Sequence, residues 1–144
     1  AQEDLQQANR TFITTEESQA LEALCQRILE PVRAMFRVPI IIHSGFRCQV
    51  LNERVGGVET SQHRRGEAVD FHIRGLDDAA GIQHAFDRIR RSDIPFGQII
   101  DEFDSRKRWL HISLGGPYRS YMACGLALTM RIDTDGKKQY GPGI

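Results

Sequence analysis

Apolar residues at helical spacing mark the start of the predicted ordered region. Thr14 followed three residues later by Glu17 forms a capping box, which predicts that a helix begins there. Pro31 interrupts the apolar pattern, so the segment up to Phe36 is either a kinked continuation or a second short helix. The predicted buried face of the helix consists of Leu21, Leu24, Cys25 and Ile28.

A second helical pattern begins at Asp77-Asp78 and runs to about Arg91. Between the two helices, residues 50–55 predict one or two helical turns, which Gly56-Gly57 ends by opening a loop. The predicted buried stripe of the second helix consists of Ile82, Ala85, Phe86 and Ile89.

Strand patterns fill much of the remaining chain. Residues 39–42 are rich in β-branched side chains and predict a buried strand. Residues 68–73 alternate, with Val69, Phe71 and Ile73 on one face and Ala68, Asp70 and His72 on the other. Two further strands, residues 98–103 and 109–114, flank a charged hairpin tip, and residues 118–132 are strand-like.

These elements predict an α+β fold, with helices packed on one side of a small, mainly antiparallel sheet. A chain of 144 residues fits one domain. We expect residues 1–13 to form an N-terminal arm, residues 14–132 the single domain, and the Gly-rich residues 133–144 a flexible C-terminal tail.

Composition excludes several classes of function. Nineteen basic and nineteen acidic residues cancel, so no global field recruits nucleic acid. No apolar run is long enough to span a bilayer, and the polar first residues show no secretion signal. Three widely spaced cysteines, Cys25, Cys48 and Cys124, predict neither disulfides nor a structural zinc site, and Cys25 is expected in the core. We expect a monomer.

Two short stretches carry candidate chemistry: residues 61–70 and residues 109–113. They offer two imidazoles and one carboxylate, His63, His111 and Asp70, the ligand types that hold a catalytic zinc ion while leaving a position open for water. Gly66 is the expected pivot that folds His63 back beside the strand that carries Asp70. If the three side chains converge, the protein is a hydrolase.

Several short motifs follow one another along residues 44–113. They are Ser44-Gly45-Phe46-Arg47, Asn52, Val55-Gly56-Gly57, Ser61-x-His63-x-x-Gly66-x-Ala68-x-Asp70 and Trp109-Leu110-His111-Ile112-Ser113. Together these motifs resemble the M15 peptidase family. The resemblance implies one zinc ion bound by His63, Asp70 and His111, and a fold like that of D-Ala-D-Ala peptidases and hedgehog-type domains. It also implies a D-Ala-D-Ala carboxypeptidase or an endopeptidase that cuts peptides of bacterial peptidoglycan.

The general base is the point at which the chain departs from the family pattern. Many members place an acidic residue three positions before the last histidine ligand, where this chain has Arg108. Close relatives instead place a glutamate at the end of the preceding strand, which points to Glu102. Strand alternation puts Glu102 on the pocket face and Asp101 on the other, although a bulge could exchange the two. Asp101 and Asp104 remain reserve candidates.

Two other residues have expected roles near the metal. The resemblance assigns Arg47 to the oxyanion that forms at the attacked carbonyl, and Ser61 is a candidate for binding substrate or orienting a ligand. His72 is a candidate neighbour of the metal ligands, whereas His43 and His84 are expected to be structural. Cys48 is not expected to be a nucleophile, because no basic partner stands beside it.

Two alternatives to the peptidase hypothesis remain at this stage. One is a non-catalytic zinc domain that docks to the cell wall or to a protein partner, as the likeness to hedgehog-type domains implies. The other, a Ser61-His63-Asp70 hydrolase, lacks a glycine-flanked serine elbow. Action at the cell wall is expected in either the periplasm or the extracellular space, by a secreted protein or by a phage or bacterial protein made in the cytoplasm.

Overall fold

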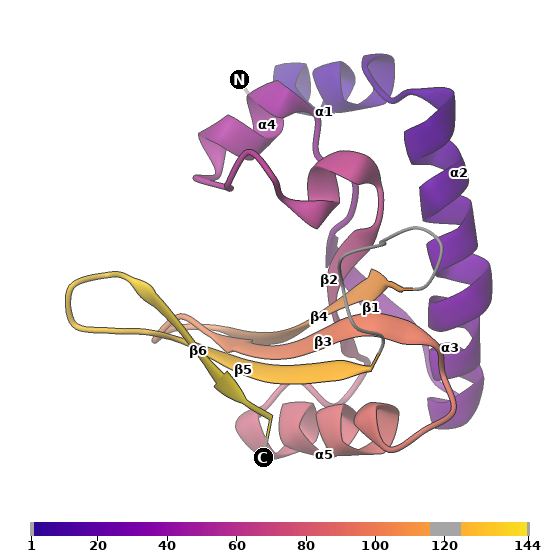
Figure 1. Cartoon of the computed structure of the whole chain (residues 1–144), viewed down its shortest axis with the longest axis vertical. Coiled ribbons are helices and arrows are strands. Elements are labelled where there is room, and N and C mark those ends of the chain that lie inside the picture. The colour runs from indigo at the N-terminus through magenta and orange to yellow at the C-terminus, as the bar shows by residue number, and fades with distance from the viewer. Residues whose placement is uncertain (1, 116–124, 144) are drawn as a thin grey trace.

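The computed structural model describes residues 2–115 and 125–143 and confirms the α+β class. Six strands form one sheet in the order β1-β2-β4-β3-β5-β6 (Figure 1). The sheet is mixed, because β3 and β5 pair in parallel while the other pairings are antiparallel. The strands are β1 (Ile40–Ser44), β2 (Ala68–Ile73), β3 (Phe96–Phe103), β4 (Arg108–Leu114), β5 (Leu126–Ile132) and β6 (Lys138–Pro142).

The longest helical path begins at the predicted capping box, where Thr14 and Glu17 cap each other's backbone N–H groups. A π-helical turn lies immediately before Pro31, which has no N–H for the regular helical ladder. No described helix is long and apolar enough to cross a membrane. The helical elements are α1 (Gln2–Thr11), α2 (Thr15–Leu24), η1 (Cys25–Leu29), α3 (Glu30–Phe36), α4 (Gln49–Arg54), η2 (Gln62–Arg65) and α5 (Ala79–Arg90).

One face of the sheet carries the hydrophobic core. The predicted alternation of β2 holds, with Val69, Phe71 and Ile73 in the core, where helix α5 and the α2–α3 path also contribute buried side chains. Figure 1 shows α5 beneath the sheet, while α1 and α4 lie across from it on the other side. The polar face of β2, β4 and β3 is therefore turned toward α1 and α4.

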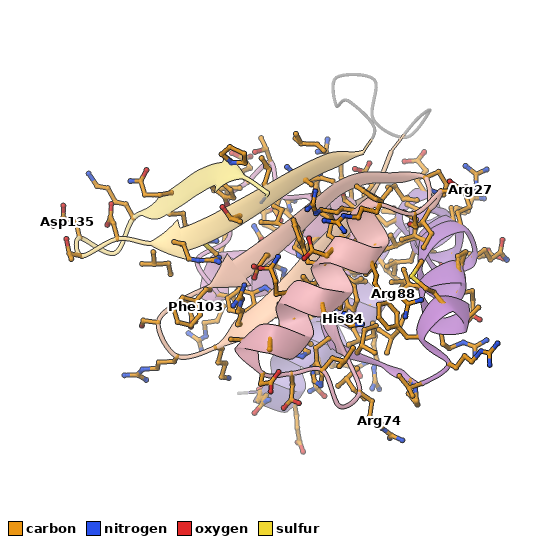
Figure 2. All side chains as sticks on the ribbon, turned by 90° about the horizontal axis from the view of Figure 1, so that it is seen from below. Arg27, Arg74, His84, Arg88, Phe103 and Asp135 are labelled. Carbon is orange, nitrogen blue, oxygen red and sulfur yellow. The ribbon has the colours of Figure 1, made fainter. Side chains whose placement is uncertain are left out.

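The structure differs from the sequence predictions at both ends of the chain. The expected N-terminal arm contains helix α1, which buries none of its side chains. Part of the expected tail forms β6, because Asp133 accepts backbone N–H groups from Asp135 and Lys137 and closes a turn between β5 and β6. Figure 2 shows Asp135 at the outer tip of this hairpin.

Two burial predictions were wrong. Strand β1 lies at the edge of the sheet, and Ile42 is 48% exposed, so β1 is not a buried strand. Cys25 is exposed because it begins the π-helical turn, which widens the helix and shifts the apolar face. Cys124 and residues 118–124 of the expected strand-like segment lie outside the described residues.

A buried carboxylate ties three strands and a helix together on the core side. Asp101 of β3 is fully buried and accepts hydrogen bonds from Arg108 of β4, one of them at 2.8 Å from Nε. Arg131 of β5 also contacts Asp101, and Arg108 donates to Gln83 of α5 at 3.1 Å. This network fixes Asp101 on the face opposite to the metal ligands.

The network predicts a stability cost for neutralising Asp101. Asp101→Asn should lower the free energy of unfolding by about 2–3 kcal/mol, because Arg108 would lose its charged partner inside the protein. Urea unfolding followed by circular dichroism measures this change. The exposed control Asp93→Asn should shift stability by less than about 0.5 kcal/mol. An equal, small effect of both variants would contradict the proposed role of the network.

Candidate metal centre

Three predicted ligands converge on the polar face of the sheet. Asp70 of β2 and His111 of β4 are direct register partners, so their side chains leave the sheet side by side. His63 reaches them from η2, which ends at Gly66 with a left-handed backbone of φ 68°. A Cβ at Gly66 would lie 2.3 Å from the carbonyl oxygen of Glu17, so the predicted pivot requires glycine for two reasons.

The three ligand atoms lie within 4.8 Å of one another. His63 Nε2 is 3.2 Å from Asp70 Oδ1, and His111 Nδ1 is 3.0 Å from the same oxygen. Both imidazoles are buried, whereas Asp70 retains partial exposure toward the pocket. One carboxylate oxygen therefore sits between two ring nitrogens.

In each histidine, one ring nitrogen faces Asp70 (the inner nitrogen) and the other faces away from it (the outer nitrogen). The hydrogen bond of the outer nitrogen determines whether the inner nitrogen carries a proton. His63 Nδ1 is 2.8 Å from the carbonyl oxygen of Gly45, and His111 Nε2 is 2.7 Å from Gln62 Oε1. A carbonyl oxygen only accepts, so each outer nitrogen must carry the proton and donate it. In neutral imidazoles the inner nitrogens then carry no proton, and their lone pairs face the Asp70 carboxylate. Such a group of electron-pair donors is stabilised by a cation, and the donor set suits a metal ion.

The protonation states favour a metal ligand set. Burial would raise the pKa of Asp70, but wherever an inner ring nitrogen of His111 or His63 carries a proton, its hydrogen bond to Asp70 outweighs burial and holds the pKa well below its ordinary value. Burial lowers the pKa of His63, although Asp70 opposes that effect. At neutral pH the cluster therefore offers an ionised carboxylate and a neutral imidazole at His63, the forms that bind metals.

A pocket of about 1090 Å³ opens over the cluster. Helix α1, helix α4 and the following loop form one wall, and the strands form the floor and the opposite wall. Candidate residues Arg47, Ser61 and Glu102 all line this pocket with the three ligands. The pocket is also lined by Gln62, Gln98, Asp104, Met130, Ile132, Lys138 and Tyr140.

Glu102 is a buried carboxylate on the pocket side of β3. It is 8% exposed, and burial raises its pKa, with Asp70 acting in the same direction and His111 in the opposite one. The register of β3 with β4 runs without a bulge from Gln98 to Phe103. The alternation predicted for this strand therefore holds, with Glu102 toward the pocket and Asp101 away from it.

Arg47 is held next to a metal ligand by the backbone. Its N–H donates to the carbonyl oxygen of His63 at 2.9 Å. The guanidinium is half-buried, and burial lowers its pKa while Asp70 and Glu102 act to raise it. Arg47 Nε is buried without a hydrogen-bond partner among the described residues.

The other candidate residues, Asp101, Asp104 and Ser61, form contacts with other parts of the chain. The ion pairs of Asp101 remove it from the pocket, and Asp104 accepts backbone N–H groups of Arg106 and Lys107 at the hairpin tip. The Ser61 hydroxyl accepts the backbone N–H of His63 at 3.3 Å and so helps to start η2. Arg108, at the family's usual acidic position, points to the core side.

The other histidines do not join the cluster. His43 and His72 contact each other edge to face beside it, with ring centroids 4.8 Å apart. His84 packs against Phe36 on the far side of the sheet, and Figure 2 shows it on α5 near Arg88. Cys48 is buried at the start of α4.

Sequence reasoning missed Gln62 and the carbonyl of Gly45, the two acceptors that orient the histidines. Gln62 stands next to His63 in the sequence, but neighbouring position alone does not reveal a contact with His111, 49 residues away. Lys138 and Tyr140 were also missed, because the tail that contains them was not predicted to be a strand.

Two imidazoles and a carboxylate, with a buried glutamate in the same pocket, are typical of metal-dependent hydrolases. The family model for Peptidase M15 matches residues 2–113, and the chain belongs to this family. A comparison with curated proteins finds no match. The family implies peptidase activity, and the His63–Asp70–His111 cluster is a site that could hold a metal ion.

The outer acceptor Gln62 gives a test of the site geometry. Gln62→Leu should weaken zinc affinity about 10–100-fold, because His111 would lose the contact that fixes its tautomer and ring orientation. Competition with a chromophoric chelator measures the affinity. Gln98→Leu, in the same pocket but outside the ligand set, is the matched control and should bind zinc normally. Unchanged affinity in Gln62→Leu would contradict this geometry.

Proposed function

We propose that the protein is a zinc peptidase that hydrolyses peptide bonds of bacterial peptidoglycan, as a D-Ala-D-Ala carboxypeptidase or a cell-wall endopeptidase. The observation that carries the proposal is the convergence of His63, Asp70 and His111 beneath a pocket that also contains Glu102. Membership in Peptidase M15 supports the reaction class. The motif resemblance supports the cell-wall substrate and a fold like that of D-Ala-D-Ala peptidases and hedgehog-type domains.

His63, Asp70 and His111 would hold the ion at the floor of the pocket. Zinc bound there would supply Lewis acidity, which polarises a carbonyl and lowers the pKa of water to about 7. Gly45 and Gln62 keep the two imidazoles in the tautomers that bind metal. The ligand set thus needs no tautomer exchange before it can accept the ion.

Glu102 would act as the general base. Its carboxylate lies in the pocket beside the cluster, and its raised pKa brings it closer to neutrality, which suits a group that takes up and returns a proton. It accepts a proton from the attacking water and passes it to the departing amine. No covalent bond between enzyme and substrate is required.

Arg47 would stabilise the negative charge that develops on the attacked carbonyl oxygen. Its guanidinium stays charged, and Arg47 lines the pocket together with the three ligands and Glu102. Ser61 would contact the substrate at the edge of η2, in addition to capping that helix. Neither Arg47 nor Ser61 belongs to the cluster that would hold the ion.

Hydrolysis of purified peptidoglycan tests the proposal. The zinc-loaded protein should release free amines, and a chelator should abolish the release until zinc is restored. Mass analysis of products from defined muropeptides then separates carboxypeptidase from endopeptidase cleavage. Zinc-loaded protein that binds peptidoglycan but releases no amine would favour the non-catalytic zinc domain instead.

The proposed base makes a sharper prediction. Glu102→Gln should lower kcat about 10²–10⁴-fold, because the amide cannot accept the proton, while zinc content stays unchanged. Steady-state kinetics and metal analysis measure the two quantities. Asp104→Asn applies the same chemical change to another carboxylate in the pocket and should retain kcat. Full turnover by zinc-loaded Glu102→Gln would rule out Glu102 as the base.

A further inference from the structure

The C-terminal hairpin forms one wall of the pocket. Met130 and Ile132 of β5, with Lys138 and Tyr140 of β6, all line it. The register places Met130 between Glu102 and Tyr140 across three neighbouring strands. The hairpin lies outside residues 2–113, which match the family model, so membership in the family does not imply this wall.

Lys138 and Tyr140 stand on the same face of β6, because they are two residues apart in a strand. Within the described part of the chain, neither side chain forms a hydrogen bond or an ion pair. Burial and the charge of Glu102 raise the pKa of Tyr140, and Lys138 acts to lower that of Glu102. Both side chains are therefore within electrostatic reach of the proposed base.

Lys138 is a cation of this wall that forms no ion pair within the described residues. Arg47 lies near two carboxylates, Asp70 and Glu102, and the charge of Lys138 also acts on Glu102. The Asp104 carboxylate accepts two backbone N–H groups of the hairpin tip. Because Lys138 makes no direct contact with any of these carboxylates, its ammonium group can bind a carboxylate of the substrate, and the Tyr140 hydroxyl adds a second donor.

The spacing of the strands sets the distance from the metal. Strand β6 is three strand positions from β4, which carries His111. Three spacings of about 4.8 Å give about 14 Å across the sheet. The register places Tyr140 level with Trp109, two residues along β4 from His111, and Lys138 lies two residues further along β6, so the separations grow to about 16–20 Å. An extended peptide covers this distance with about five or six residues. An anion bound at this wall therefore belongs to a part of the substrate several residues from the cut bond.

We propose that Lys138 and Tyr140 form a subsite for a carboxylate of the substrate peptide, about five or six residues from the bond that is cut. The proposal rests on the proposed peptidase function and names a substrate feature that this chain selects. The carboxylate belongs either to the C-terminus or to an acidic side chain of the peptide. Both residues are positioning residues, because they bind substrate away from the reacting atoms.

Kinetics of the zinc-loaded full chain test the subsite with synthetic peptides containing D-Ala-D-Ala. One set compares a C-terminal acid with the amide, and another compares an internal glutamate with glutamine at different distances from the cut bond. Lys138→Met should raise KM about fivefold for peptides with the carboxylate correctly placed and not for the matching amides, whereas any change in kcat through Glu102 should be equal for acid and amide. High salt should reduce the difference between acid and amide in the wild type.

Lys137→Met is the matched control, since Lys137 is the exposed neighbour outside the pocket lining, and it should not change KM. Tyr140→Phe should raise KM less than Lys138→Met does. An equal KM increase for acid and amide peptides, or no increase in Lys138→Met, would overturn the subsite.

Failure of the proposed function would be visible separately, as a zinc-loaded wild type that cuts none of the peptides. In that case, calorimetric titration with the same peptides tests the subsite independently of cleavage, because it measures binding affinity. A preference for acid over amide that Lys138→Met abolishes would support it. Equal affinity of the wild type for acid and amide would overturn it.

Discussion

The site depends on two imidazole lone pairs directed at one carboxylate oxygen. Gly45 and Gln62 accept the outer N–H groups of His63 and His111, so the inner nitrogens have no proton to offer Asp70. Without a cation, this arrangement concentrates electron-rich atoms in a buried place, which is unfavourable. A bound metal ion would remove this repulsion, because the two nitrogen lone pairs and the carboxylate oxygen would all bind it. The fold therefore maintains a geometry that is stable when the ion is bound.

The sheet supports this geometry by separating two kinds of chemistry on its faces. On the core side, Asp101 is fixed by Arg108 and Arg131, and apolar side chains pack against α5 and the α2–α3 path. On the pocket side, the next residue, Glu102, is left near the metal ligands. Adjacent acidic residues thus have opposite roles because strand alternation sends them to opposite faces.

Much of this could be predicted from the sequence, where local patterns carry the information. The capping box at Thr14, the alternation of 68–73 and the face shared by Gln98 and Glu102 all depend on short-range periodicity. Strand β6 could not be predicted, because it is polar and depends on the turn that Asp133 closes. The contact between Gln62 and His111 joins distant parts of the chain, and no local pattern encodes it.

The most direct measurement of the central claim is ¹H–¹⁵N correlation NMR of the histidine rings, with and without zinc. In the zinc-loaded protein, His63 should carry its proton on Nδ1 and His111 on Nε2. On zinc addition, the nitrogen shifts of His63 Nε2 and His111 Nδ1 should move together at one equivalent. Zinc binding that leaves these two nitrogens unchanged, or rings protonated on the inner nitrogens in the loaded protein, would contradict the central claim.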